Sequence, residues 1–232
     1  MIRQVSMSFE EVIHQHFSWF KGKLDSLEHI RDNELKILAC CFLADSLAKS
    51  AYPYKPAKER FISVLENFSG DKNWGRVCLY YMIEDKRYPR LKQEPAIDNY
   101  ISERLKWVKD KSRIHYCEVD PEFSVIETET AAFPSFSLFI ELCRQYSYCT
   151  VFYNKYRCCL ANESNVLSEF VSESAGGDRP YYASLKERKA EASYKKRLIF
   201  PVNYCLESLR AINQNVKDLM IRENLNPYQR YE

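Results

Sequence analysis

The chain has 232 residues, which is long enough to bury a sizeable hydrophobic core. Its 34 Lys and Arg nearly balance its 32 Asp and Glu, so the net charge of +2 does not by itself indicate binding to nucleic acid or to an anionic membrane. Any binding driven by charge therefore requires a local basic patch.

The apolar runs and the cysteines indicate a cytoplasmic protein. The longest apolar run, residues 37–44, is far shorter than the roughly 20 residues that cross a bilayer, and the N-terminus lacks a secretory signal pattern. The nine cysteines include two vicinal pairs within apolar segments but no C-x-x-C spacing. We therefore expect reduced, buried thiols, no metal and no other cofactor.

The N-terminal part predicts two long helices that form an antiparallel hairpin. Apolar residues recur every three or four positions from Phe9 to Leu27, which is the period of one buried helix face. A second series with this period consists of Leu35, Leu38, Ala39, Phe42, Leu43 and Leu47. Pro53 prevents this second helix from continuing, and the short connection between the two helices favours antiparallel packing.

Shorter helices are expected in the middle of the chain, over residues 61–68, 74–82 and 97–108, where apolar residues again repeat at helical spacing. The segment from 113 to 134 breaks this period and contains Pro121 and Pro134. We interpret it as irregular, with Ile114 and Tyr116 as candidates for a short strand.

The C-terminal part predicts two more long helices. The first follows Pro134 and carries its apolar stripe from Phe136 to Ala161, and the second begins near Pro201 and extends to Leu219. The polar connection between them is longer than compact domains usually keep without a functional reason. The predicted fold is all-α, with a single helical domain over residues 1–232: a bundle with a long N-terminal hairpin and two long C-terminal helices flanking an extended loop.

The end of the first C-terminal helix carries the most informative motif. Residues 152–165 read F-Y-N-K-Y-R-C-C-L-A-N-E-S-N and resemble bacterial HEPN-like proteins, which commonly read R-C-x-L-V-H-E-x-R at this place. The likeness continues at Arg179-Pro180-Tyr181-Tyr182 and at residues 198–201, so the HEPN-like portion covers about residues 135–220. Members of this superfamily are helical, usually dimeric, and cleave RNA without a metal through an R-x4-6-H motif.

The resemblance implies that Arg157 and Asn162 occupy the two catalytic positions of this motif. The planar, permanently charged guanidinium of arginine can hold a phosphate and stabilise charge that builds on it. Histidine would move the proton, whereas the amide of Asn162 neither accepts nor donates one at a usable pKa. The motif thus implies a homodimeric toxin, defence or RNA-processing component with a weak or lost ribonuclease site; if active, it would be a metal-independent endoribonuclease.

A basic, tyrosine-containing stretch follows the motif and is the predicted RNA-binding region. Cations suit the RNA backbone, and aromatic rings suit the stacking of unpaired bases. The candidate residues are Arg179, Tyr181, Tyr182, Lys186, Arg188, Lys189, Lys195, Lys196 and Arg197. A solvated loop is the alternative, and the acidic stretch over residues 118–129 offers these cations partners within the chain or between subunits.

The alternative function is a non-catalytic helical module for protein interaction or assembly. In that case Arg157 pairs near a helix end, and Asn162 caps a helix C-terminus. Glu11 and His14 have the spacing of half a di-iron site, but a second such half is missing from the sequence. The candidate partners are therefore single-stranded RNA, a second copy of the chain and another protein, with no membrane.

Overall fold

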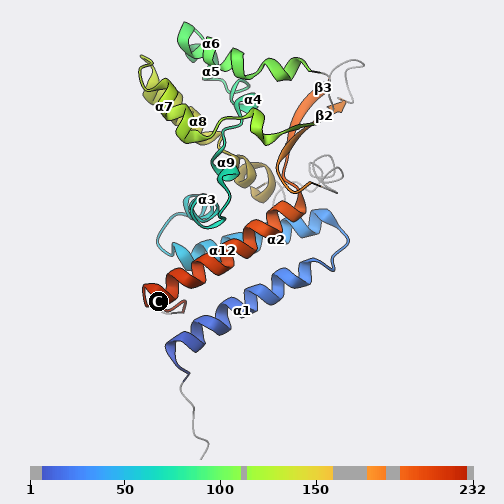
Figure 1. The fold of residues 1–232 in the computed structure, drawn as a ribbon, viewed down its shortest axis with the longest axis vertical. Helices are drawn as coiled ribbons and strands as arrows, with labels where there is room; N and C mark the ends of the chain where they lie inside the picture. The colour runs from blue at the N-terminus through green and yellow to red at the C-terminus, as the bar shows by residue number, and fades with distance from the viewer. Residues whose placement is uncertain (1–6, 111–113, 159–176, 187–193, 229–232) are drawn as a thin grey trace, which may run out of the picture. The chain divides into compact units, whose positions relative to one another are not determined.

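A computed structural model of the chain describes residues 7–110, 114–158, 177–186 and 194–228. Most of these residues are helical, as the sequence predicted, and a small three-stranded sheet accompanies the helices (Figure 1). The described residues form two compact units. The first contains residues 7–71 and 205–228, and the second contains residues 72–204.

The first unit is built from α1 (Phe9–Leu27), α2 (Asn33–Ala51), α3 (Ala57–Phe68) and most of α12 (Val202–Arg222). Helix α1 begins with a capping box, in which the Ser8 hydroxyl accepts from the Glu11 backbone N–H and the Glu11 carboxylate accepts from the Ser8 N–H. Glu11 therefore has a structural role at the helix start. Helices α1 and α2, for which the sequence predicts a hairpin, contact each other (Figure 1).

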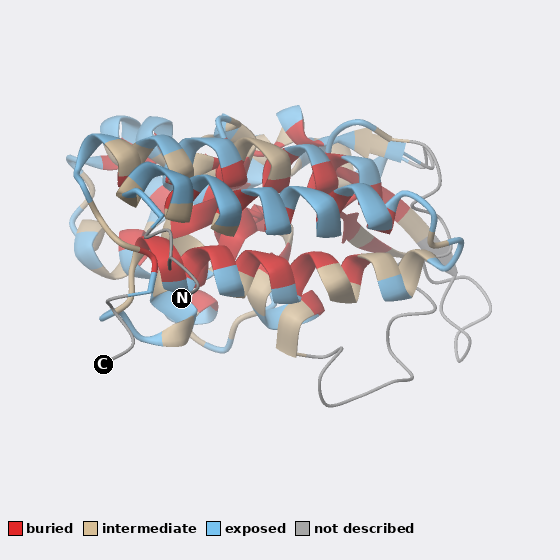
Figure 2. Cartoon of the chain, turned by 90° about the horizontal axis from the view of Figure 1, so that it is seen from below, coloured by how far each residue is buried: buried red, intermediate tan, exposed pale blue. Residues whose placement is uncertain are grey.

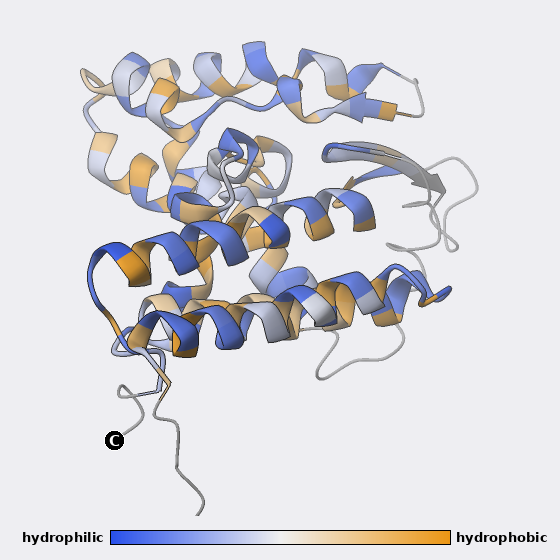
Figure 3. Cartoon of the chain, turned by 60° about the horizontal axis from the view of Figure 1, so that its bottom comes forward, coloured by the Kyte–Doolittle hydropathy of each residue, from blue (hydrophilic) through white to orange (hydrophobic). Residues whose placement is uncertain are grey.

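The amphipathic pattern of α1 correctly predicted its buried face, which includes Ile13, Phe17 and Phe20. Buried residues lie along one side of the helices and exposed residues along the other (Figure 2), and hydrophilic and hydrophobic positions alternate accordingly (Figure 3). The predicted face of α2 was wrong in part, because Leu35 and Phe42 are more than half exposed. Helix α2 is apolar on several faces, so the period of its apolar residues does not determine which face is buried.

The second unit contains short helices, and the sheet lies among them. Its helical elements are η1 (Lys72–Gly75), α4 (Leu79–Met82), α5 (Tyr88–Leu91), α6 (Pro95–Arg104), η2 (Lys106–Lys109), η3 (Cys117–Val119), α7 (Phe123–Thr130), α8 (Phe136–Gln145), α9 (Tyr148–Phe152) and the π-helix η4 (Tyr153–Arg157). Its strands are β1 (Ile114–Tyr116), β2 (Tyr181–Lys186) and β3 (Tyr194–Ile199).

The predicted long helix after Pro134 is interrupted between α8 and α9. The Tyr146 carbonyl accepts from the Cys78 N–H at 2.9 Å, and the Tyr148 N–H donates to the Arg76 carbonyl at 2.8 Å. The Ser147 hydroxyl then caps the start of α9 by accepting from the Thr150 N–H. A tertiary backbone pairing with the extended segment around Val77 thus breaks a helix that the apolar period alone predicts to continue.

The predicted extended loop between the C-terminal helices contains β2 and β3, which is a second correction. The strands are antiparallel in the order β1-β2-β3, and His115 is paired with Tyr182 and Tyr182 with Leu198. The outward backbone N–H groups of the edge strand β3 are bound by tyrosine hydroxyls: Lys196 N–H donates to Tyr80, Leu198 N–H to Tyr81 and Phe200 N–H to Tyr156. These three tyrosines cover an edge that would otherwise be open for strand pairing.

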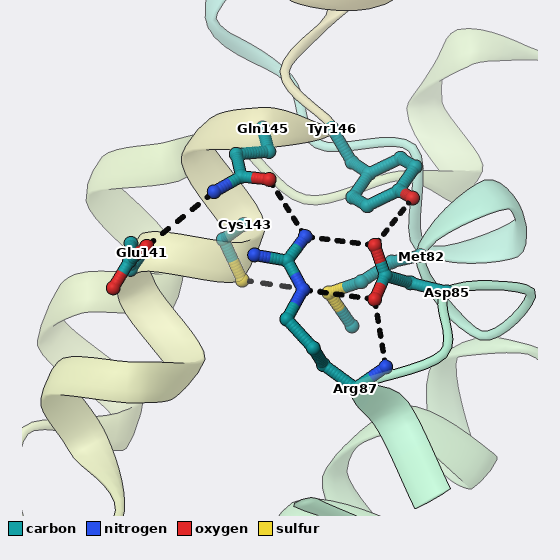
Figure 4. A network of polar contacts seen from close by, with 7 residues as sticks. All are labelled: Met82, Asp85, Arg87, Glu141, Cys143, Gln145 and Tyr146. Atoms are coloured by element: carbon teal, nitrogen blue, oxygen red, sulfur yellow. Dashed lines mark hydrogen bonds and ion pairs between the residues drawn. The ribbon is translucent and has the colours of Figure 1, made fainter.

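A polar network joins the start of α5 to the end of α8 (Figure 4). The Arg87 guanidinium donates to both oxygens of Asp85 and to the side chain of Gln145, and the Tyr146 hydroxyl donates to Asp85 at 2.8 Å. The hydrogen bond from the Arg87 side chain, which outweighs desolvation, holds the pKa of the Asp85 carboxyl well below its usual range. The network lies beside a hydrophobic cluster that includes Leu79, Met82, Phe139 and Cys143.

The described cysteines are free thiols, and all of them except Cys158 are buried. Burial raises the pKa of thiols such as Cys78 and Cys205 well above the ordinary value, so they stay protonated and behave as small apolar groups. Among the described helices, none has the length and apolar character needed to cross a membrane.

Candidate functional site

Arg157 ends the π-helical turn η4. Its neighbour Cys158 donates its backbone N–H to the Tyr153 carbonyl, five residues earlier. Such turns are rare and recur at functional sites, because they reposition the side chains of one helical turn. The Arg157 guanidinium is half-buried, with its central carbon 5.5 Å from the centre of the Tyr153 ring, and Lys155 on the same turn is exposed.

Tyr156 fixes this turn against strand β3. Its hydroxyl donates to the Leu198 carbonyl at 3.3 Å and accepts from the Phe200 N–H at 3.3 Å, and its ring stacks on Phe152 at 5.1 Å. Tyr156 is almost completely buried, so η4 is held at a defined position beside β3. The turn that carries Arg157 and the strand that carries part of the predicted basic stretch are therefore neighbours.

Strand β3 presents Lys195 and Arg197 on one face and Lys196 on the other, because side chains alternate along a strand. Lys195 forms an ion pair with Glu84 at 2.9 Å, and the Arg197 charge acts to lower the pKa values of Tyr80 and Tyr81, although burial raises both overall. Lys155 lies near the same tyrosines, with Nζ 5.9 Å from the centre of the Tyr81 ring. We call the group Lys155, Arg157, Lys195 and Arg197 the η4–β3 basic surface.

Other predicted RNA-binding residues lie elsewhere. Arg179 precedes β2, pairs with Glu118 at 2.5 Å and lies over the Tyr116 ring at 4.3 Å. This ion pair joins the basic stretch to the acidic stretch over residues 118–129, as the sequence alternative predicted for such cations. Tyr181, Tyr182 and Lys196 are buried, so in this structure they contribute to the interior of the second unit.

Several predicted residues cannot be placed. Asn162, Arg188 and Lys189 lie outside the described residues, and only the backbone of Lys186 is described. The pairing of Arg157 with Asn162 that the motif implies thus stays a prediction.

Sequence reasoning missed a buried carboxyl group at the centre of the second unit. The side chain of Asp120 is fully buried and accepts from the hydroxyls of Tyr148, at 2.9 Å, and Tyr182, and from the Leu79 N–H at 3.4 Å. The Tyr182 hydroxyl also lies 2.9 Å from Cys78 Sγ. We call these residues the Asp120 network.

The electrostatics of the Asp120 network follow from its burial. Desolvation raises the pKa of Asp120 to about 7, although the hydrogen bonds from Tyr182 and Tyr148 and the nearby Arg76 guanidinium act in the opposite direction. Burial and the neighbouring carboxyl also raise the pKa values of both tyrosines, so their hydroxyls remain donors. In the sequence, Asp120 is one of several acidic residues in a row, and nothing there distinguishes it from its exposed neighbours.

The described residues contain no group of three or more His, Cys, Asp or Glu side chains placed to hold a metal ion. Comparisons with protein-family models, with curated proteins and with solved structures each found no match to this chain. The likeness to HEPN proteins therefore rests on the residues quoted from the sequence.

Proposed function

We propose that this chain is a HEPN-like, RNA-associated protein that binds single-stranded RNA at the η4–β3 basic surface and has lost efficient ribonuclease activity. The observation that carries the proposal is the pair of hydrogen bonds from the Tyr156 hydroxyl to β3. They join the turn that ends at Arg157, the motif arginine, to the end of β3, the strand that carries Lys195 and Arg197. Cations from two segments that are distant in the sequence then act together on an RNA backbone.

We infer the loss of catalysis from the asparagine that stands where the motif has its histidine. Position 162 is asparagine, and His115, the one described histidine of the second unit, lies on β1. Strands β1 and β3 are separated by β2, so their axes are about 10 Å apart at ordinary strand spacing. The Tyr182 hydroxyl is buried, and burial raises its pKa well above the ordinary value, which makes it a poor proton carrier near neutral pH. General acid-base help of roughly 10²- to 10⁴-fold is then missing.

The proposal is tested by the binding and cleavage of a fluorescent single-stranded RNA with EDTA present. Arg157→Ala should weaken binding several-fold and reduce the salt dependence of binding by about 0.7 for the one lost phosphate contact. The matched control is Arg144→Ala, which removes an exposed arginine of α8 that pairs with Glu127. An unchanged affinity in Arg157→Ala, or the absence of any binding, would overturn the RNA proposal. Metal-free cleavage by the wild type would contradict the loss of activity.

A second candidate function, protein interaction, is favoured by α2. Leu35 and Phe42 are 54% and 57% exposed and lie two helical turns apart, hence on the same side of the helix. Exposed large apolar side chains at this spacing are typical of helix-mediated interfaces. We propose a second copy of the chain as the partner. Phe42→Ser should shift sedimentation toward the monomer, whereas a monomeric wild type would contradict this part of the proposal.

A further inference from the structure

A second polar cluster lies on the face of the sheet opposite to Lys195 and Arg197. His115 on β1 and Lys196 on β3 are on the same face as Tyr182, because their cross-strand partners are Tyr182 and Ser184. Trp107 on η2 covers this face, with its ring 4.9 Å from the His115 ring and 4.7 Å from the Tyr182 ring. Lys196 Nζ lies 5.8 Å from the centre of the Trp107 ring.

Two nitrogen atoms of this cluster have no hydrogen-bond partner among the described residues. The atoms Trp107 Nε1 and His115 Nε2 are buried, and within the described part of the chain neither has a hydrogen-bond partner. The indole nitrogen can only donate, so it is not satisfied by any neighbouring donor. An unsatisfied buried polar group destabilises a fold, and two of them on rings whose centres lie 4.9 Å apart call for an explanation.

Lys196 supplies a positive charge close to these two nitrogens. Lys196 is 5% exposed and donates from Nζ to the Asp110 carbonyl at 3.1 Å. Desolvation and the nearby Lys196 charge lower the pKa of His115, and desolvation lowers the pKa of Lys196; Asp110 acts against both effects. Tyr80 and Tyr182 are the other titratable groups beside Trp107. A bound anion would stabilise the protonated forms of both His115 and Lys196.

The Asp110 carboxylate borders the cluster at the solvent side. Its side chain is 53% exposed, and Oδ2 lies 3.9 Å from His115 Nε2, which is too long for a hydrogen bond. Asp110 therefore occupies the approach to the unsatisfied nitrogens without satisfying them.

We propose that Trp107, His115 and Lys196 form a binding site for a phosphate group. A tetrahedral oxyanion offers several acceptor oxygens, enough for the indole N–H, the imidazole N–H and the lysine ammonium at once. The group can come from free inorganic phosphate or from the 5′-phosphate of a nucleotide, since both present the same chemistry. The site lies apart from the η4–β3 basic surface and does not rest on the RNA proposal.

The test uses the full chain labelled with ¹⁵N, whose three tryptophans give separate indole N–H resonances. Inorganic phosphate is titrated at constant ionic strength, and the Trp107 resonance is assigned with Trp107→Phe. We expect a saturable shift of the Trp107 resonance only, with no such shift on titration with chloride. A Trp107 resonance that stays in place would overturn the proposal, and the unchanged Trp74 resonance reports that the second unit remains folded.

Two variants sharpen the test. Asp110→Asn removes the competing carboxylate at a half-exposed position and should bind phosphate several-fold more tightly. Lys196→Met keeps the buried aliphatic packing but removes the ammonium, and should weaken binding at least tenfold. Equal affinity in all three proteins would contradict the assignment. A 5′-phosphorylated dinucleotide and its 5′-hydroxyl form then distinguish the two sources of phosphate, because only the former should compete with inorganic phosphate.

Discussion

The Asp120 network and the cluster of Trp107, His115 and Lys196 lie on the same side of the sheet, and Tyr182 contacts both. They differ in how fully their polar groups are satisfied by hydrogen bonds. In the first, a buried carboxyl accepts from three donors. In the second, two buried nitrogen atoms lack a hydrogen-bond partner among the described residues. A satisfied network stabilises the fold, whereas unsatisfied buried polar groups destabilise it unless a ligand pairs with them. The comparison separates a structural region from a candidate ligand site.

The largest effect is expected from Asp120→Ala. The substitution leaves the hydroxyls of Tyr148 and Tyr182 and the Leu79 N–H buried without this acceptor. At about 1–3 kcal/mol for each orphaned group, the free energy of unfolding should fall by roughly 3 kcal/mol or more. Urea denaturation at pH 5 measures this loss, with the exposed Glu118→Ala as the control. A loss no greater than that of the control would show that the network is not structural.

The pH dependence of stability gives a second test. The folded state keeps the proton of Asp120 up to a pKa of about 7, whereas an unfolded aspartate releases it near 3.8. The free energy of unfolding should therefore decrease as the pH rises from about 4 to about 7 and then level off. Asp120→Asn should remove this slope. Asp85 contributes in the opposite sense, because its lowered pKa makes stability fall only as the pH drops below its ordinary value.

A matched pair of substitutions compares the two clusters directly. Tyr148→Phe removes one satisfied hydrogen bond to Asp120 and should cost about 1–2 kcal/mol. His115→Phe removes an unsatisfied buried ring nitrogen at similar volume, so it should not lower the free energy of unfolding and should raise it by about 1 kcal/mol or more. Chemical denaturation without added phosphate measures both. Equal losses in the two variants would remove the distinction between the clusters.

The smallest effect is expected at the covered edge of the sheet. Tyr81→Phe removes the acceptor of the Leu198 N–H and should cost about 1 kcal/mol, with faster hydrogen exchange at that amide. Tyr54→Phe is the control, since Tyr54 is 87% exposed. An unchanged exchange rate at Leu198 would show that the hydroxyl does not protect this edge.

The sequence predicted those elements whose cause is local. The period of Ile13, Phe17 and Phe20 fixes both the helix and its buried face, and proline and capping residues mark helix ends. It failed where a distant partner decides the structure, as at Ser147, where pairing with Val77 interrupts a helix. Strand β3 was not predicted because its consecutive Lys195, Lys196 and Arg197 hide the alternation of buried and exposed positions. Asp120 was not recognised because the sequence does not show which residue in a run of acidic residues is buried.

The three tyrosines along β3 have a consequence for self-association. In many proteins charged residues or prolines on an edge strand prevent pairing with strands of other chains. An open row of backbone N–H groups would otherwise bind such strands and start fibrillar aggregation. Here the hydroxyls of Tyr80, Tyr81 and Tyr156 accept hydrogen bonds from such N–H groups. The strand therefore does not offer these N–H groups as a template for amyloid growth, and chemical modification of the three phenols would expose that template.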